Sequence, residues 1–174
     1  MRSLRQRRAG FSLLELAVVV AVVALLITVA LERMLRYVEL AEKGHMEQTI
    51  GVVRSALGLR FAGLYVQGKT AEIQALAGEN PMDWLAERPP GYVGVLWDPR
   101  LADVERGIWY FERSRHVLVY VPSRTRYLVV GPDGDPRIGF RAMVDFRAPA
   151  GGSLQLERLG MEPVRPYNWF EDLE

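Results

Sequence analysis

The chain has 174 residues and no cysteine, and its 22 basic and 21 acidic side chains give a net charge of +1. A chain without cysteine has no thiol nucleophile, no Cys-based zinc site and no disulfide, so packing alone must stabilise it. The nearly balanced charge gives no electrostatic case for a nucleic-acid partner.

The first 31 residues join a basic leader to an apolar run. The leader has four arginines and no acid among its first eight residues (Arg2, Arg5, Arg7 and Arg8), and residues 11–31 are apolar or small except for Glu15. A helix over residues 11–31, rising about 1.5 Å per residue, spans the roughly 30 Å hydrocarbon core of a bilayer. The basic end predicts a cytoplasmic leader, with the rest of the chain beyond the inner membrane.

Glu15 is the one charged side chain in this run. A carboxylate at mid-bilayer costs on the order of 3 kcal/mol, although Glu15 would lie only about 6 Å into the membrane. One interpretation is a functional carboxylate with a partner; the other is a tolerated glutamate whose side chain reaches the headgroups.

The segment from the leader through GFSLLELAVVVAVVALLITVAL resembles the class III signal of type IV pilins and type II secretion pseudopilins. The resemblance implies that a prepilin peptidase cuts between Gly10 and Phe11 and methylates the new amine of Phe11. It also implies that Glu15 meets the N-terminal amine of a neighbouring subunit, and either charge alone would be costly in hydrocarbon. Cleavage removes the four leader arginines and leaves 18 basic against 21 acidic residues, a net charge of −3.

Beyond Leu31 the pattern predicts that the helix continues to about Tyr65, from a start near Leu13. No proline interrupts it, and apolar residues recur at spacings of three and four (Met46, Ile50, Val53, Leu57, Phe61 and Leu64). Three glycines seven apart (Gly44, Gly51 and Gly58) form a line along this helix. They are either tolerated in a packed helix or mark the close approach of another element.

Residues 66–91 predict a connecting loop with short helices. AEIQALAG suggests a helix ended by Gly78, and MDWLAE a helical turn after Asn80-Pro81. We expect Trp84 and Leu85 to pin this loop to the head. The tract NPMDWL, with the Pro-Pro-Gly-Tyr after it, is similar to the connecting segment of mannose-sensitive-haemagglutinin-type minor pilins.

Residues 92–174 predict a β-sheet head and a C-terminal tail. Short connections between β-branched and aromatic runs indicate an antiparallel meander, with a further edge strand at 153–159 (runs 92–97, 107–113, 116–122, 126–131 and 138–146). Residues 117–121 are apolar on both faces, so one face should pack on the helix and the other needs a cover from the connecting loop or a neighbouring subunit. The aromatic tail should fold back on the head or dock on a partner.

The sequence shows no catalytic constellation, and we expect no enzyme and no cofactor. His45 and His116 are the only histidines. Asp133 and Asp135 flank Gly134 and are weak candidates for calcium, because two carboxylates are few without help from Asp98 or Asp103. Asp-Gly after a strand is also the commonest hairpin signal.

Together these features predict an α+β, pilin-like fold in five segments: leader 1–10, transmembrane helix 11–31, amphipathic continuation 32–65, connecting loop 66–91 and head 92–174. The resemblance implies a structural subunit, a minor pilin or pseudopilin, of a type IV pilus or type II secretion pseudopilus. Its partners would be a prepilin peptidase, other pilin or pseudopilin subunits and an inner-membrane assembly platform. It would sit in the inner membrane as a single-pass protein with its head in the periplasm, and later in a fibre. The alternatives are a membrane-anchored extracytoplasmic binding domain that never enters a fibre, and an exported protein cut near Ala30.

Overall fold

The computed structural model describes residues 12–147 and 155–170. The predicted processing site between Gly10 and Phe11 therefore lies outside the described residues. The helix α1 runs from Leu13 to Val66, close to the predicted bounds. The chain divides into two compact units, residues 1–38 and 39–174, and α1 contributes to both.

In the first unit, α1 is an apolar helix whose large side chains, from Leu13 to Leu31, are all exposed. Neither glycine nor proline occurs between residues 13 and 38, so nothing in the backbone interrupts the helix. Within the described residues α1 is also the one helix long and apolar enough to cross a membrane. An apolar helix without internal cover is what a lipid-facing segment requires.

In the second unit, the rest of α1 buries one stripe against the head. The buried apolar side chains follow the predicted spacing of three and four, except that Phe61 is only half-buried (Met46, Ile50, Val53, Leu57 and Leu64). Glu39 and Thr49 are buried in the same stripe. The amphipathic pattern therefore locates the helix–sheet interface correctly.

The connecting segment contains the short helices α2 (Thr70–Ala75), η1 (Leu76–Gly78) and η2 (Pro81–Trp84). Asn80 caps η2, because its side-chain oxygen accepts the backbone N–H of Met82 at 3.2 Å. Trp84 and Leu85 pack against the hydrophobic core, which confirms that they pin this segment to the head.

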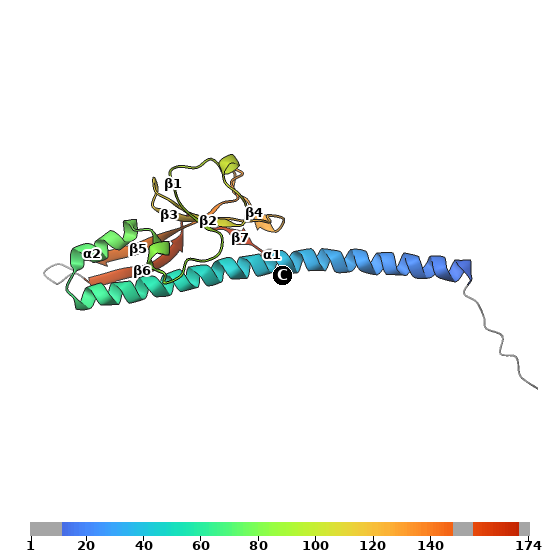
Figure 1. Cartoon of the computed structure of the whole chain (residues 1–174), viewed down its shortest axis with the longest axis horizontal. Helices are drawn as coiled ribbons and strands as arrows, with labels where there is room; N and C mark the ends of the chain where they lie inside the picture. The colour runs from blue at the N-terminus through green and yellow to red at the C-terminus, as the bar shows by residue number, and fades with distance from the viewer. Residues whose placement is uncertain (1–11, 148–154, 171–174) are drawn as a thin grey trace, which may run out of the picture. The chain divides into compact units, whose positions relative to one another are not determined.

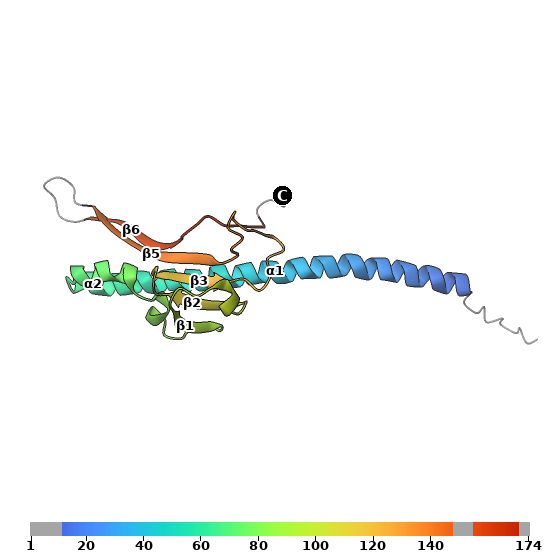
Figure 2. The same cartoon turned by 90° about the horizontal axis from the view of Figure 1, so that it is seen from above.

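A five-stranded sheet forms the head, in the order β1-β2-β3-β5-β6, as Figure 2 shows from above. The strands are β1 (Tyr92–Leu96), β2 (Ile108–Glu112), β3 (Val117–Val121), β5 (Ile138–Arg147) and β6 (Gln155–Pro163). The pairs from β2 through β6 are antiparallel, and β6 is an edge strand as predicted. The α+β, pilin-like architecture is confirmed: a long helix packed on a mostly antiparallel sheet (Figure 1).

The predicted meander is wrong at two strands. β1 pairs with β2 in parallel, because the segment after β1 crosses over the sheet through η3 (Leu101–Asp103) before β2 begins. The run at 126–131 does not follow β3 in a hairpin. Its strand β4 (Leu128–Val129) pairs instead with β7 (Asn168–Trp169), and β5 takes the place beside β3.

Both faces of β3 are buried, as its apolar alternation predicts. Leu118 and Tyr120 join the core against α1, whereas Val117, Val119 and Val121 form a second cluster with Tyr110 on the opposite face. That face is covered by the crossover segment and by Val164 (Leu96, Leu101 and Val104 pack on it). The predicted cover by the connecting loop is therefore wrong, because the segment between β1 and β2 packs on this face instead.

Candidate functional site

The N-terminus of α1 is capped by Ser12. Its hydroxyl accepts the backbone N–H of Glu15 at 3.1 Å, and its carbonyl accepts the N–H of Leu16 at 3.1 Å. Ser12 and Glu15 thus stand in the S-x-x-E arrangement of a capping box, and a carboxylate in the first turn also favours the helix dipole. The spacing of Ser12 and Glu15 in the sequence already carries this signal, although the capping role was not predicted. Glu15 therefore has a local structural role available beside the assembly role that the resemblance implies.

Glu39 is the first residue of the second unit, and its carboxylate is buried with 2% exposure. One carboxylate oxygen accepts the backbone N–H of Tyr127 at 2.9 Å and the indole N–H of Trp169 at 3.0 Å. Both donors satisfy the charge, which would otherwise be costly to bury. Glu39 therefore ties α1 to β7 and to Tyr127, the residue just before β4.

Glu42, one turn further along α1, holds the chain that leaves β3. It accepts the hydroxyl of Tyr120 at 2.9 Å and the backbone N–H of Ser123, and Arg124 lies 3.9 Å from its second oxygen. Burial is the larger cause that raises the pKa of the Tyr120 hydroxyl, and its hydrogen bond to the Glu42 carboxylate raises that pKa further. Because the chain after β3 is held by Glu42 and Glu39, it turns toward the helix and does not extend the large sheet.

The C-terminal segment folds back on the head, as predicted. Trp169 is fully buried, and its carbonyl accepts a hydrogen bond from the ammonium of Lys43 at 2.9 Å. The ring of Phe170 stacks on that of Tyr127, with the ring centroids 4.9 Å apart. We call this set the tail clasp: Glu39, Lys43, Tyr127, Trp169 and Phe170. In a chain without disulfides, the clasp fastens the end of the described chain to the helix.

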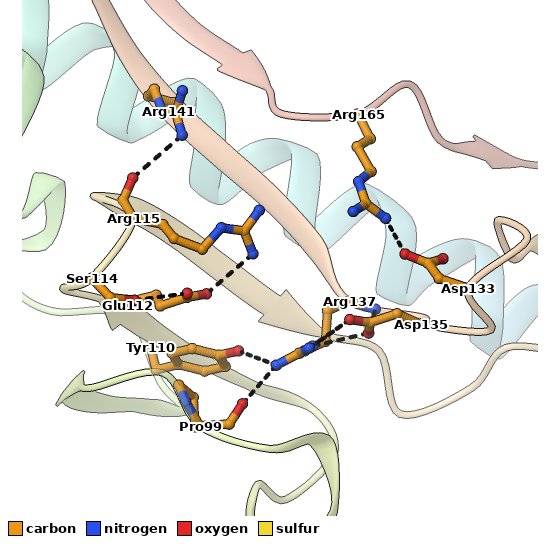
Figure 3. Close-up of polar contacts among 10 residues, drawn as sticks. All are labelled: Pro99, Tyr110, Glu112, Ser114, Arg115, Asp133, Asp135, Arg137, Arg141 and Arg165. Atoms are coloured by element: carbon orange, nitrogen blue, oxygen red, sulfur yellow. Dashed lines mark hydrogen bonds and ion pairs between the residues drawn. The ribbon is translucent and has the colours of Figure 1, made fainter.

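On the opposite face of the sheet, Arg137 joins three segments (Figure 3). It forms a bidentate ion pair with Asp135, with a closest approach of 2.6 Å, and donates to the carbonyl of Pro99 at 2.9 Å and the hydroxyl of Tyr110 at 3.3 Å. Burial raises the pKa of Asp135, but the hydrogen bonds from Arg137 outweigh it and hold that pKa below its usual range. Burial also raises the pKa of Tyr110. Arg137 thereby fixes the crossover segment on β2.

The two calcium candidates both face arginines (Figure 3). Asp135 is paired with Arg137, and Asp133 is paired with Arg165, whose hydrogen bond lowers the pKa of the Asp133 carboxyl. Gly134, between them, has a φ of 69°, a conformation that suits glycine in a turn. Across residues 12–147 and 155–170, no group of three His, Asp or Glu side chains is placed to hold a metal. In the structure, these carboxylates act as ion-pair partners in a turn.

A small pocket of about 60 Å³ lies beside these pairs, above Val117 and Gly139. Glu112 lines it and is 3% exposed; it accepts the hydroxyl of Ser114 at 3.1 Å and lies 3.6 Å from Arg115. The pocket is too small for a substrate of ordinary size, and its charged groups already form ion pairs within the protein.

The histidines do not come together. His45 is exposed on α1, whereas His116 lies in the β2–β3 turn with its Nδ1 2.8 Å from the carbonyl of Gly78. No atom lies within 4 Å of a Cβ built on Gly44, Gly51 or Gly58. Within the described chain, therefore, no strand or helix approaches the glycine line closely.

The buried Glu39 and the partly buried Glu42 were not predicted as contact residues, although the sequence holds a signal for them. Glu39 and Glu42 precede Met46 at the same spacing of three and four that marks the buried stripe. A carboxylate at a core-facing position of a helix indicates a buried polar contact, because it must be bonded there.

The fold is that of a pilin-like protein, and the N-terminal segment agrees with it. Residues 5–31 match the family model of the prokaryotic N-terminal methylation motif. This match supports a class III prepilin signal, which is the signal of type IV pilins and pseudopilins. The match covers the signal and the apolar run, not the head. No curated protein and no solved structure matches the chain significantly.

Proposed function

We propose that this chain is a minor pilin or pseudopilin, a structural subunit that enters a fibre through its apolar helix. The methylation motif at residues 5–31 supports this most directly, together with a helix whose apolar side chains have no cover within the first unit. The basic leader holds the precursor with its N-terminus in the cytoplasm, and the head is delivered to the periplasm. A prepilin peptidase then cuts between Gly10 and Phe11 and methylates Phe11.

In the assembled fibre, Glu15 pairs with the N-terminal amine of Phe11 in a neighbouring subunit. Cleavage creates that amine within the apolar environment that also holds the carboxylate, so each charge compensates the other. The pair sets the axial register between successive subunits when an inner-membrane assembly platform extracts the chain. Other pilin or pseudopilin subunits are the partners, and the head presents its surface to them or to cargo.

Two substitutions separate the assembly role of Glu15 from its capping role. Glu15→Gln removes the charge but keeps the S-x-x-E/Q capping pattern, whereas Glu15→Ala removes both. We expect both variants to lose the leader normally and to be missing from the sheared fibre fraction, because both lack the charge. Glu32→Gln, at the other end of the apolar run, is the matched control and should assemble like the wild type.

The measurement is the fraction of processed chain in fibres against membranes. Wild-type assembly by Glu15→Gln would show that the charge is not needed and that capping explains Glu15. If the wild type and Glu15→Ala both keep the leader and both stay in the membrane fraction, the chain is an anchored binding domain outside any fibre.

A further inference from the structure

The chain between β3 and the end of β4, residues 122–130, is fastened to the first turns of α1 in the second unit. The backbone N–H of Tyr127 donates to Glu39 at 2.9 Å, and that of Ser123 donates to Glu42. Glu39 is the first residue of this unit. We call residues 122–130 the basic loop. Its two hydrogen bonds fix it at the end of the head that comes first along α1.

The basic loop carries positive charge beside exposed apolar side chains. Its charged residues are Arg124 and Arg126, and it contains no acid. The Arg124 side chain is 48% exposed, although it also lies 3.9 Å from a carboxylate oxygen of α1. Arg126 is exposed, with its guanidinium 5.8 Å from the centre of the Tyr127 ring. Val129 and Val130 are exposed by 58% and 36%. Arginines combined with an aromatic ring and apolar side chains are typical of a surface that lies against a bilayer.

The basic loop is held only a short way along the chain from the end of the apolar run. That run ends at Leu31, and α1 continues without a break through Glu39. Eight residues of helix rise about 12 Å, so Glu39 lies at most this far beyond the hydrocarbon. The headgroup layer takes up about 5–8 Å of that distance. The remaining gap, about 4–7 Å, is shorter than the Debye length of about 8 Å at physiological ionic strength. The loop is therefore within electrostatic reach of the headgroups.

The helix between the apolar run and Glu39 has the composition of a bilayer interface. Tyr37 is 62% exposed, Arg33 and Arg36 are exposed as well, and Glu32 is the one acid among residues 32–38. Tyrosine favours the level of the headgroups, and arginine side chains reach toward the phosphates from there. This composition predicts that the bilayer surface is crossed just before the residue that holds the basic loop.

We propose that the basic loop rests on the anionic phospholipid headgroups of the membrane that α1 spans, with Arg124 and Arg126 at the lipid phosphates. An anionic lipid surface complements the two arginines and accepts the exposed valines beside them. A second copy of the loop would instead bring like charges together. The inference rests on the membrane anchoring in the proposed function, not on fibre assembly. The contact holds the head against the membrane until the subunit is extracted.

The test uses the uncut, full-length chain in lipid nanodiscs, so the result depends on neither the peptidase nor a fibre. The chain has no cysteine, so Ser123→Cys introduces a unique thiol into the basic loop for a fluorophore. Gln67→Cys, just past the end of α1, is the matched distant reporter. The discs contain either phosphatidylcholine alone or an equal mixture with phosphatidylglycerol. Both kinds carry the same fraction of lipid with a nitroxide headgroup, which quenches a fluorophore close to the surface.

We expect quenching at position 123 to be about three-fold or more stronger in the anionic discs than in the neutral ones. Salt at about 0.5 M should remove this difference, because it screens exposed charges. Arg124→Gln combined with Arg126→Gln should remove it as well. The matched control is Arg113→Gln combined with Arg147→Gln, which deletes the same charge at two exposed positions outside the loop and should keep the difference.

Four results would overturn the proposal. They are equal quenching at position 123 in the two kinds of disc, a difference that survives the loss of both loop arginines, a difference lost equally in the control variant, and quenching at position 67 as strong as at position 123. The acids at positions 171, 172 and 174 are present in every variant, so they do not affect the comparison. A chain that fails to enter the discs would contradict the anchoring in the proposed function as well, so the two failures are distinguishable.

Discussion

The tail clasp predicts a large loss of stability when Glu39 is removed. Glu39→Ala deletes the acceptor of two donors, the backbone N–H of Tyr127 and the indole N–H of Trp169, at a site that is 2% exposed. A buried donor left unpaired costs about 1–3 kcal/mol, so the two together predict a loss of about 2–6 kcal/mol in the free energy of unfolding. This is a large part of the 5–15 kcal/mol typical of a whole domain.

Glu39→Gln keeps an oxygen for both donors and loses only the charge. Because charge-assisted hydrogen bonds contribute roughly 1 kcal/mol more than neutral ones, this variant should lose about 1–2 kcal/mol. Glu47→Ala is the control on the same helix. Its carboxylate is 52% exposed and lies 3.8 Å from Lys43, so the change should stay within about 0.5 kcal/mol.

The assay is denaturant unfolding of the full-length chain in detergent micelles, followed by tryptophan fluorescence, since Trp109 and Trp169 are both buried in the head. In a thermal scan, the melting temperature of Glu39→Ala should fall by roughly 4 °C for each kcal/mol of unfolding free energy lost. If Glu39→Ala costs less than about 1 kcal/mol, or if Glu39→Gln costs as much as Glu39→Ala, the clasp does not depend on these hydrogen bonds.

Three further predictions concern the head and the part of α1 that packs on it. The pKa of Asp135 is lowered in the folded chain, so its ion pair should stabilise the head above the unfolded pKa of about 3.9 and lose that effect as pH falls through the folded value. The difference in unfolding free energy between the wild type and Asp135→Asn should therefore be constant from pH 5 to about pH 7 and shrink below about pH 4. A difference that persists at about pH 2 would contradict this. Gly139→Ala would place a Cβ 2.8 Å from Val117 Cγ1, so it should lower the free energy of unfolding, measured by chemical denaturation, by about 1–3 kcal/mol. Adding Val117→Ala should recover part of this loss, whereas additive losses from the two substitutions would argue against the contact. Gly51→Ala has open space around it in α1 and should stabilise the chain by about 0.5–1 kcal/mol; a loss of stability in the same assay would show a contact that the structure lacks.

The long helix and the two-sided burial of β3 could be predicted because both depend on local periodicity. The spacing of Met46, Ile50, Val53 and Leu57 identifies the helix face, and the alternation from Val117 to Val121 places each side chain on its own face of the sheet. These patterns repeat within a few residues of the sequence.

The strand order could not be predicted in the same way, because it depends on contacts between distant residues. β4 leaves the large sheet because Glu39 accepts the N–H of Tyr127, 88 residues away, and β7 joins β4 because Trp169 bonds the same carboxylate. The parallel pairing of β1 depends on a crossover held by Arg137, whose contact with Pro99 spans 38 residues. The Asp133–Asp135 run likewise showed carboxylates in a turn but gave no sign of the Arg165 that pairs with one of them.

The mature N-terminus tests the central claim most directly. We would determine it by mass spectrometry of the chain from membranes with and without prepilin peptidase. The class III signal predicts a chain that begins at N-methylated Phe11, and only where the peptidase is present. A chain that keeps Met1 in both membranes, or one cut near Leu31, would contradict the assignment of this protein as a fibre subunit.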